Sequence, residues 1–225
     1  MKTRIGIVGY GRMGHALARQ LVEDYKVFVC DIRKDIEIES FIEFVDAKCL
    51  FSICRYIILS INQKDIENVV QENKKYCKDK TYFINIVTDY PTQKIRKMVS
   101  DCFGIKVITA KIMGQYLAIE KGVPVVVVTD EIEEDMFSVV KSVFSNFSLI
   151  IHGDTNAVKT INHEITKRAI NMLLDGYRYC EQQGMTKSVY EIAVKAIATG
   201  TIEEFQQYTD NAYIKTIIEE IRNGE

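Results

Sequence analysis

The chain lacks several features that would assign it to a specialised class of protein. Its 225 residues contain no tryptophan, two prolines and three histidines. We find no apolar run that approaches the roughly 18 residues of a membrane span. The N-terminus also lacks the apolar segment of a secretory signal, because glycines and a basic residue follow the first strand-like run at once. We therefore expect a cytoplasmic protein that does not bind a membrane.

The cysteines are too scattered to indicate a disulfide framework or a zinc site. None of the six belongs to a Cys-x-x-Cys pair. They stand at Cys30, Cys49, Cys54, Cys77, Cys102 and Cys180. This spacing is typical of reduced thiols that fill the interior of a protein. The acidic run Glu131–Asp135 indicates the first turn of a helix, where carboxylates are favoured, and we expect no metal site.

Neither sign of charge dominates the chain. Twenty-nine lysines and arginines face 31 aspartates and glutamates, which gives a formal net charge of −2. With this balance the chain has no basic surface field that would attract nucleic acid or an anionic membrane, so neither is expected as a partner. The apolar share of 47% and the charged share of 27% are ordinary for soluble globular proteins, and they allow a real core.

Short apolar runs alternate with helical stretches over the first two thirds of the chain. The expected strands are Arg4–Val8, Lys26–Cys30, Tyr56–Ile61, Tyr82–Val87, Lys106–Thr109, Val123–Val128 and Phe147–Ile151. The expected helices are Met13–Glu23, Asp65–Cys77, Thr92–Phe103 and Glu131–Phe144, with a further short helix inside the ambiguous region 36–54. Because the strands do not alternate between apolar and polar residues, we expect them to be covered on both faces, as in a parallel sheet between helices.

The character of the chain changes after Gly153. From Thr155 to Arg222 only helical periodicity remains, with expected breaks at Gly184 and near Gly200. The predicted fold class is α/β, with a doubly wound, mostly parallel Rossmann sheet (residues 1–153) followed by a small all-helical domain (residues 154–225). Seventy-odd residues are marginal for an independent core, so these helices are expected to pack on the first domain or to build a homodimer.

Three glycines form the strongest chemical signal. Gly9, Gly11 and Gly14 follow the pattern Gly-x-Gly-x-x-Gly between an apolar strand and a helix. They permit, in this order, a tight turn, a close backbone approach to a pyrophosphate, and close packing of helix on strand. The other cofactor-contacting positions in this turn are Tyr10, Arg12 and Met13. The pattern predicts a dinucleotide-binding βαβ unit with phosphates at the helix start.

The next strand ends in residues that bear on the choice of cofactor. The carboxylate of Asp31 would accept hydrogen bonds from the adenosine ribose hydroxyls and repel a 2′-phosphate, which favours NAD. Arg33 and Lys34 follow at once and could hold that phosphate instead, which favours NADP. The expected cofactor is NAD or NADP, with NAD preferred.

The segment Gly9–Gln20 resembles the opening of the β-hydroxyacid and 6-phosphogluconate dehydrogenases and of the pyrroline-5-carboxylate reductases. The runs Ile57–Val70, Ile84–Val87 and Val107–Val128 are similar to later strands and loops of the reductases. Met113-Gly114-Gln115 stands where the reductases carry Met-Pro-Asn. The resemblance implies a Rossmann domain followed by a helical domain that commonly builds a dimer.

The segment Gly153–His163 resembles the dehydrogenase signature at the start of the interdomain helix. By this resemblance Lys159 is the acid/base, and Asn162 or His163 positions the substrate. Hydride reduction of a carbonyl needs a proton donor, and a lysine desolvated in a cleft can donate near neutral pH because its pKa is lowered. On a helix these three positions share one face. A lysine near a helix start can also be simply solvated, and histidines such as His15 or His163 can be packed or exposed.

Polar residues follow two of the expected strands. Ser60, Ile61 and Asn62 come at the end of one, and Asn85 lies near the end of the next. Because ligands of open α/β sheets bind outside the carboxyl ends of the strands, we expect these residues to contact the nicotinamide riboside. The segment Lys111–Tyr116 is a similar candidate on the substrate side.

The patterns together predict an enzyme, an NAD(P)-dependent oxidoreductase that moves hydride to or from a small carbonyl, imine or hydroxy acid. The complete βαβ pattern and the helix that carries Lys159 support this hypothesis. The alternative is a catalytically degenerate NAD(P)-binding regulatory protein, in which the nucleotide shifts a conformational or dimer equilibrium. Turnover of a substrate distinguishes the two.

Overall fold

A computed structural model describes residues 2–206 and 211–223 of the chain. The chain forms two compact units, Met1–Asn162 and His163–Glu225, and each is considered separately. The domain boundary expected after residue 153 lies nine residues before this division, which follows Asn162, and it stays a prediction.

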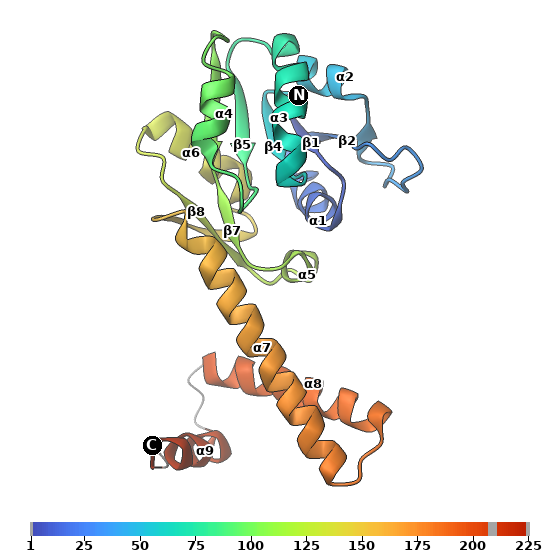
Figure 1. Cartoon of the computed structure of the whole chain (residues 1–225), viewed down its shortest axis with the longest axis vertical. Coiled ribbons are helices and arrows are strands. Elements are labelled where there is room, and N and C mark those ends of the chain that lie inside the picture. Colours follow the sequence, from blue (N-terminus) through green and yellow to red (C-terminus); the bar gives the residue numbers. More distant parts are fainter. Residues whose placement is uncertain (1, 207–210, 224–225) are drawn as a thin grey trace. The chain divides into compact units, whose positions relative to one another are not determined.

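The first unit contains a six-stranded parallel sheet (Figure 1). Its strands are β1 (Thr3–Val8), β2 (Tyr25–Cys30), β3 (Glu43–Phe44), β4 (Tyr56–Leu59), β5 (Thr81–Asn85) and β6 (Ile105–Thr109). They follow the order β3-β2-β1-β4-β5-β6, so the winding direction reverses between β1 and β4. Ligands of such sheets bind at this switch point, outside the carboxyl ends of the strands.

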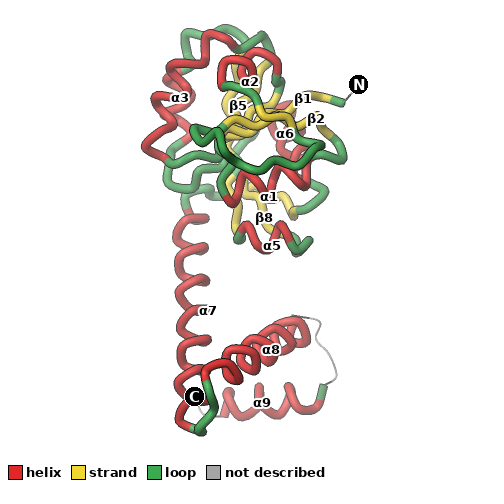
Figure 2. The backbone as a smooth tube through the Cα atoms, turned by 90° about the vertical axis from the view of Figure 1, so that its right-hand side faces the viewer, coloured by secondary structure: helices red, strands yellow, loops and turns green. Residues whose placement is uncertain are grey.

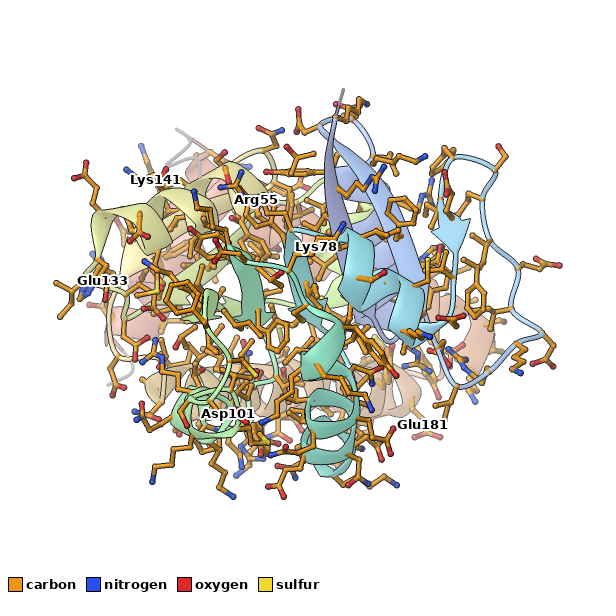
Figure 3. All side chains as sticks on the ribbon, turned by 90° about the horizontal axis from the view of Figure 1, so that it is seen from above. Arg55, Lys78, Asp101, Glu133, Lys141 and Glu181 are labelled. Carbon is orange, nitrogen blue, oxygen red and sulfur yellow. The ribbon has the colours of Figure 1, made fainter. Side chains whose placement is uncertain are left out.

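Helices cover both faces of the sheet, and Figure 2 shows the strands between them. The helices within residues 12–144 are α1 (Arg12–Leu21), α2 (Ala47–Ile53), α3 (Ile66–Asn73), α4 (Thr92–Met98), α5 (Tyr116–Glu120) and α6 (Glu134–Phe144), of which α5 packs against α1. One core cluster includes Leu17 of α1 and Phe144 of α6, and the other includes Leu50 of α2 and Ile95 of α4. Charged side chains such as Lys141 lie around the outside (Figure 3). The predicted doubly wound Rossmann fold is confirmed.

A second, smaller sheet continues the first unit. It consists of β7 (Lys111–Met113), β8 (Val125–Thr129) and β9 (Ser148–His152), with β7 antiparallel and β9 parallel to β8. The expectation that every strand is covered on both faces is wrong for β9, because Leu149 is 62% and Ile151 is 37% exposed. An edge strand has a neighbour on one side only, so its apolar run does not guarantee burial.

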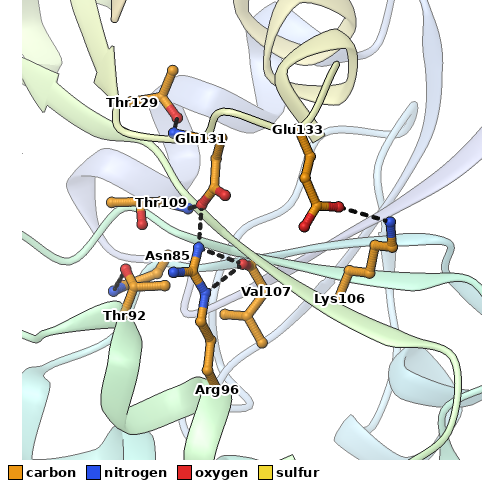
Figure 4. A network of polar contacts seen from close by, with 9 residues as sticks. All are labelled: Asn85, Thr92, Arg96, Lys106, Val107, Thr109, Thr129, Glu131 and Glu133. Carbon is orange, nitrogen blue, oxygen red and sulfur yellow. Dashed lines mark hydrogen bonds and ion pairs between the residues drawn. The ribbon is translucent and has the colours of Figure 1, made fainter. Parts of the chain in front are cut away.

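An ion pair between a buried carboxylate and a half-buried arginine connects the two sheets (Figure 4). Glu131 follows β8, and one of its carboxylate oxygens accepts hydrogen bonds from Arg96 of α4 at 2.5 Å and from the backbone N–H of Thr109 at 2.7 Å. Arg96 also donates to the carbonyl oxygen of Val107 on β6. The Glu131 side chain is 3% exposed, and this burial raises its pKa although Thr109 and Arg96 oppose the change. The pair therefore fixes β6 and β8 side by side at their carboxyl ends.

Several expected elements differ in extent from those of the structure. The strands β3 and β7 and the helix α5 have only two to five residues, too few for a periodic pattern to reveal them. The helix expected over Glu131–Phe144 begins at Glu134 instead, because Glu131 is engaged in the ion pair with Arg96. The helix expected over Thr92–Phe103 ends at Met98.

The second unit is helical. Helix α7 (Ala157–Gln182) begins in the first unit, and α8 (Lys187–Gln206) and α9 (Ala212–Asn223) follow it. Gly184, with φ of +78°, lies in the turn after α7, as expected. The break expected near Gly200 is wrong, because α8 continues through it. One glycine inside a helix costs only about 1 kcal/mol, which neighbouring residues can offset. Within the two described stretches of the chain, no helix is both long enough and apolar enough to cross a bilayer.

Candidate functional site

The glycine turn between β1 and α1 has space for a ligand at one position and none at the other two. Gly9 has φ of +94°, and a Cβ there would lie 2.4 Å from the carbonyl oxygen of Ser60. A Cβ at Gly14 would lie 2.0 Å from the carbonyl oxygen of Gly9. A Cβ at Gly11 would meet nothing within 4 Å. The outer glycines therefore allow the turn to pack, and Gly11 leaves open space beside the backbone.

The start of α1 is suited to an anion. Gly11 is its N-cap and provides no side-chain hydrogen bond, and the first turn contains no acidic residue. The first N–H groups of a helix have no partner within the helix and carry a partial positive charge. Arg12 is exposed and lies over the ring of Tyr116, 5.6 Å from its centroid. This corner fits the diphosphate of a dinucleotide, since it combines open space at Gly11, the N–H donors of the helix start and a first helical turn without an acidic residue.

Asp31 and Arg33 lie beside the turn and are bound to each other. The Asp31 Oδ2 atom accepts a hydrogen bond from the N–H of Tyr10 at 2.7 Å. Its Oδ1 atom accepts from the backbone N–H of Arg33 at 2.9 Å and from Arg33 Nε at 3.0 Å. Arg33 Nη2 donates to the carbonyl oxygen of Tyr10 at 2.9 Å and to Asp31 Oδ2 at 3.2 Å. Burial raises the pKa of Asp31, but these hydrogen bonds outweigh it and hold the pKa below its usual value.

Four hydrogen bonds fill the four lone-pair positions of the Asp31 carboxylate. Two of them come from the Arg33 side chain, which is 52% exposed. A ribose that is to bond with Asp31 must therefore displace the guanidinium of Arg33. The turn and its flanking residues thus fit a dinucleotide, and Arg33 is the part that has to move.

A second polar cluster, made of Tyr10, His15, Glu39 and Glu120, connects the turn to neighbouring segments. The phenol of Tyr10, a residue only 6% exposed, donates to Glu39 at 2.6 Å. Burial and this contact raise the pKa of Tyr10. His15 lies between two carboxylates, with Nε2 3.0 Å from Glu39 and Nδ1 3.1 Å from Glu120. His15 thus links the loop after β2 to α5, which is a structural role that the sequence analysis allowed.

A pocket of about 260 Å³ lies at the same edge of the sheet as the turn. It combines residues of the turn, of the segments that follow β4 and β5, of β7 and of the first part of α7. The lining residues are Met13, Ser60, Ile61, Ile86, Val87, Thr88, Ile112, Gly114 and Asn162. Asn62, expected at this place, caps the short 3₁₀ turn Gln63–Asp65 by accepting a hydrogen bond from Lys64.

Asn162 and Lys159 occupy the first turns of α7. The side-chain amide of Asn162 donates to the carbonyl oxygen of Ile112 at 2.9 Å and accepts from the N–H of Gly114 at 3.2 Å. Lys159 Nζ lies 2.9 Å from Asp89 Oδ1, and its side chain is 65% exposed. The expectation of a desolvated Lys159 is therefore wrong for this structure, because the pair lies at the surface.

His163 lies in the second unit, and its Nδ1 atom is 3.2 Å from Glu164 Oε1. The side chain is 72% exposed. The structure thus places it on the same helix as Lys159 and Asn162, and its proposed contact with substrate stays a prediction.

The loop between β5 and α4 (residues 86–91) is held by two buried side chains. Asn85 donates from Nδ2 to the carbonyl oxygen of Tyr90 and to Thr92 Oγ1, both at 2.9 Å, and accepts from the N–H of Val87 at 3.1 Å. Asn85 is fully buried, so its polar atoms bond to protein. Its predicted direct contact with the cofactor stays untested, and this geometry disfavours it.

Lys111 is the second of these side chains. Its Nζ atom donates to the carbonyl oxygen of Tyr90 at 3.1 Å and to that of Val87. The residue is 4% exposed. Burial lowers the pKa of Lys111 to about 7, although Asp130 and Asp89 act in the opposite direction. Within the candidate segment Lys111–Tyr116, this residue therefore has the desolvated amine that the sequence analysis assigned to Lys159.

Sequence analysis missed three residues that contribute to this region. Thr88 and Asp89 follow the carboxyl end of β5, which is the position where ligands of such sheets bind, so their place in the chain was an available signal. Glu39 meets Tyr10 and His15 from a separate segment, and no local motif indicates such a contact.

Solved structures share this fold at low sequence identity. Pyrroline carboxylate reductase of Plasmodium falciparum, solved with NADP bound, is 14% identical, with a TM-score of 0.74 over 97% of this chain and 84% of that chain. Pyrroline-5-carboxylate reductase of Coxiella burnetii is 15% identical, with a TM-score of 0.75 over 100% of this chain and 92% of that chain. A 3-hydroxyisobutyrate dehydrogenase of Mycobacterium tuberculosis, solved with L-serine, is 16% identical, with a TM-score of 0.62 over 83% of this chain and 68% of that chain.

No curated protein matches the chain at a significant level. A family model does match, under the description "NAD binding domain of 6-phosphogluconate dehydrogenase", and it spans residues 4–153. This segment contains the glycine turn, the Asp31–Arg33 pair and all six strands of the parallel sheet. The chain therefore belongs to this family of NAD(P)-binding Rossmann oxidoreductases.

Proposed function

We propose that the protein transfers hydride between NAD(P) and a small carbonyl, imine or hydroxy acid. The observation that carries the proposal is that the glycine turn and the pocket share one edge of the sheet, since Met13 of the turn lines the pocket together with Ser60 and Val87. The nicotinamide, when bound, supplies or takes up the hydride. The protein's own residues bind, orient and shield the reactants and move the proton.

Each part of the cofactor has residues that fit it. The open space at Gly11 and the first N–H groups of α1 suit the diphosphate. Asp31 suits the adenosine ribose hydroxyls, and Arg33 suits a 2′-phosphate. Ser60 and Ile61, which line the pocket, suit the nicotinamide riboside.

The proposed cofactor preference is for NAD. The Asp31 side chain is 9% exposed, and its lowered pKa keeps it anionic at neutral pH, which opposes a 2′-phosphate. Arg33 remains the residue through which NADP would bind, because its guanidinium is exposed and has to leave Asp31 in either case.

The pocket suits a small substrate. Its volume of about 260 Å³, part of which the nicotinamide would occupy, is below that of pockets for drug-sized ligands. Ile61, Ile86 and Ile112 give it an apolar wall that excludes water from a hydride transfer. Ser60 and Thr88 add hydroxyl groups that can orient a carbonyl or an amine. We therefore propose a substrate with one polar reactive group.

Lys159 is the proposed proton donor and acceptor. It lies one helical turn before Asn162, which lines the pocket, and its ion pair with Asp89 connects it to the loop that carries Val87 and Thr88. Closure around a substrate would remove water from this pair, and desolvation makes a lysine a better acid. Asn162 and His163 are the proposed substrate-positioning residues, the former through the β7 backbone that its amide holds.

We further propose a cytoplasmic homodimer built by α7, α8 and α9. Among the described residues of the second unit, no apolar side chain is fully buried, so these helices lack a core of their own. The exposed large apolar residues described in the second unit are Ile165, Ile170, Met172, Leu174, Tyr179, Met185, Val189, Ile192, Ile197, Ile202, Phe205, Tyr213 and Ile221. An apolar surface of this extent is typical of an interface between subunits.

The experiment is an assay of the full chain with NADH or NADPH and a panel of keto acids, imino acids and aldehydes, with hydroxy acids assayed in the oxidative direction. Turnover that is lost in Lys159→Ala and kept in Lys167→Ala supports the proposal, because Lys167 is an exposed lysine of the same helix. If the protein turns over no substrate of the panel but binds the cofactor tightly, the result would instead favour the catalytically degenerate regulatory protein.

A further inference from the structure

Lys111 is a buried cation at the back of the pocket wall. Side chains alternate along a strand, and on β7 the next residue, Ile112, lines the pocket. Lys111 therefore points to the other side of the strand, where its Nζ atom reaches the carbonyl oxygens of Val87 and Tyr90. Val87 itself lines the pocket, so the ammonium group holds the wall from behind.

Two carboxylates lie close enough to Lys111 to affect its pKa. Asp89, in the loop that Lys111 holds, and Asp130, just after β8, favour its protonated form, but burial outweighs both. Asp89 is shared with Lys159 of α7. Tyr90 turns its phenol away, to Glu67 of α3 at 2.9 Å. The hydrogen-bond partners of Lys111 are thus two backbone carbonyls of the loop. These hydrogen bonds offset part of the free-energy cost of burying the amine.

We propose that Lys111 is a positioning residue, whose ammonium group holds the loop of residues 86–91 so that Val87 and Thr88 form the pocket wall and Asp89 meets Lys159. The part of this inference that concerns ligands rests on the proposed function. The fixing of the loop by Lys111 does not.

A consequence is that the pocket responds to pH close to neutrality. A charged donor forms a stronger hydrogen bond to a carbonyl than a neutral amine does. Since the pKa of Lys111 is about 7, the group loses its proton in the neutral range, and its hold on Val87 and Tyr90 weakens as the pH rises. A purely structural lysine at the surface would show no such change.

The first test needs no ligand. Heteronuclear NMR of the full chain follows the backbone amides of Val87, Thr88 and Asp89 and the ε-methylene group of Lys111 through neutral pH. We expect the amides and the side chain to titrate with one midpoint near 7, and Lys111→Met to abolish the step in the amides. The matched control is Lys106→Met, because Lys106 is 42% exposed and pairs with Glu133 and Asp135 at the surface.

The second test measures the dissociation constant of NADH in the same pH range. We expect Lys111→Met to weaken binding by about tenfold and to remove its pH dependence, because two hydrogen bonds to the loop are lost. Lys111→Arg keeps two donors and a permanent charge, so it should bind NADH without the pH step.

The outcomes separate the two proposals. Loop amides that titrate in a wild-type protein that does not bind NADH would leave the role of Lys111 intact and overturn the proposed function. NADH binding with loop amides that do not titrate, or with equal affinity in Lys111→Met, would overturn the role of Lys111 and leave the proposed function intact.

Discussion

Arg33 and Asp31 form a bidentate ion pair beside the glycine turn, with Arg33 Nε 3.0 Å from Asp31 Oδ1 and Arg33 Nη2 3.2 Å from Asp31 Oδ2. The pair closes the place where an adenosine ribose would bond to Asp31. The choice between NAD and NADP therefore depends on two contacts. Ribose hydroxyls compete with Arg33 for the Asp31 carboxylate, and a 2′-phosphate competes with Asp31 for the Arg33 guanidinium.

Arg33→Ala should change the cofactor preference. Without the guanidinium, two lone-pair positions of Asp31 become available to ribose hydroxyls, so NADH binding should be kept or strengthened. NADPH binding should weaken by roughly tenfold, because a charge-assisted contact with the 2′-phosphate is lost. Isothermal titration calorimetry with both nucleotides gives the ratio. Lys97→Ala, at an exposed lysine of α4, is the control, and an unchanged ratio in Arg33→Ala would refute this role of the guanidinium.

Stability should depend on pH through Lys111. Its pKa is about 7 in the folded chain and 10.5 when exposed, so between these values the unfolded chain binds a proton that the folded chain does not. The free energy of unfolding should therefore rise with pH across this window, by up to about 5 kcal/mol. Urea unfolding at a series of pH values measures it. Subtracting the profile of Lys111→Met isolates this contribution, and parallel profiles would contradict it.

Loss of Arg96 should destabilise the first unit. Arg96→Ala leaves the buried carboxylate of Glu131 without its cation, which should cost about 3 kcal/mol. Lys106→Ala removes an exposed cation from the same region, and it should change the stability little (Figure 4). The urea midpoints of the two variants decide the matter, since equal midpoints would show that the Arg96–Glu131 pair contributes no more than a surface pair.

The oligomeric state should depend on the apolar surface of α8. Ile192 is 73% exposed, and Ile192→Glu places a charge where we expect contact with a second copy. Light scattering over a dilution series should give twice the chain mass for the wild type and for Lys195→Glu, a polar position of the same helix, and a smaller mass for Ile192→Glu. A monomeric wild type at every concentration would count against the dimer.

Much of the first unit was predictable, because its long strands are uniform apolar runs between helices of clear periodicity. The glycine turn was equally predictable, since Gly9 and Gly14 leave no room for a Cβ and Gly11 leaves space for a ligand. The three glycines fall within six consecutive residues, so a single sequence reveals their spacing. It does not reveal that the group excluding a Cβ at Gly9 is the carbonyl oxygen of the distant Ser60.

The rest depends on contacts between distant residues. Lys159 was expected to be the desolvated lysine, yet Lys111 is the buried one, because β7 turns its side chain beneath the loop after β5. Asn85 is expected to contact the cofactor, a prediction that stays untested, and the sequence did not reveal that its buried amide bonds to Tyr90 and Thr92. Burial of a polar side chain is decided by which segments pack over it, and no local pattern records that.

The binding of NADH to the glycine turn tests the central claim most directly. The chain has no tryptophan, so energy transfer from tyrosine to bound NADH gives a clear signal. We predict saturable transfer in the wild type and in Gly200→Ala, where a Cβ also meets nothing within 4 Å. In Gly11→Ala the fold should persist, but the methyl group occupies the space of the diphosphate, so NADH should bind at least about tenfold more weakly. The absence of binding of both NADH and NADPH to the wild type, or equal binding in Gly11→Ala, would contradict the account.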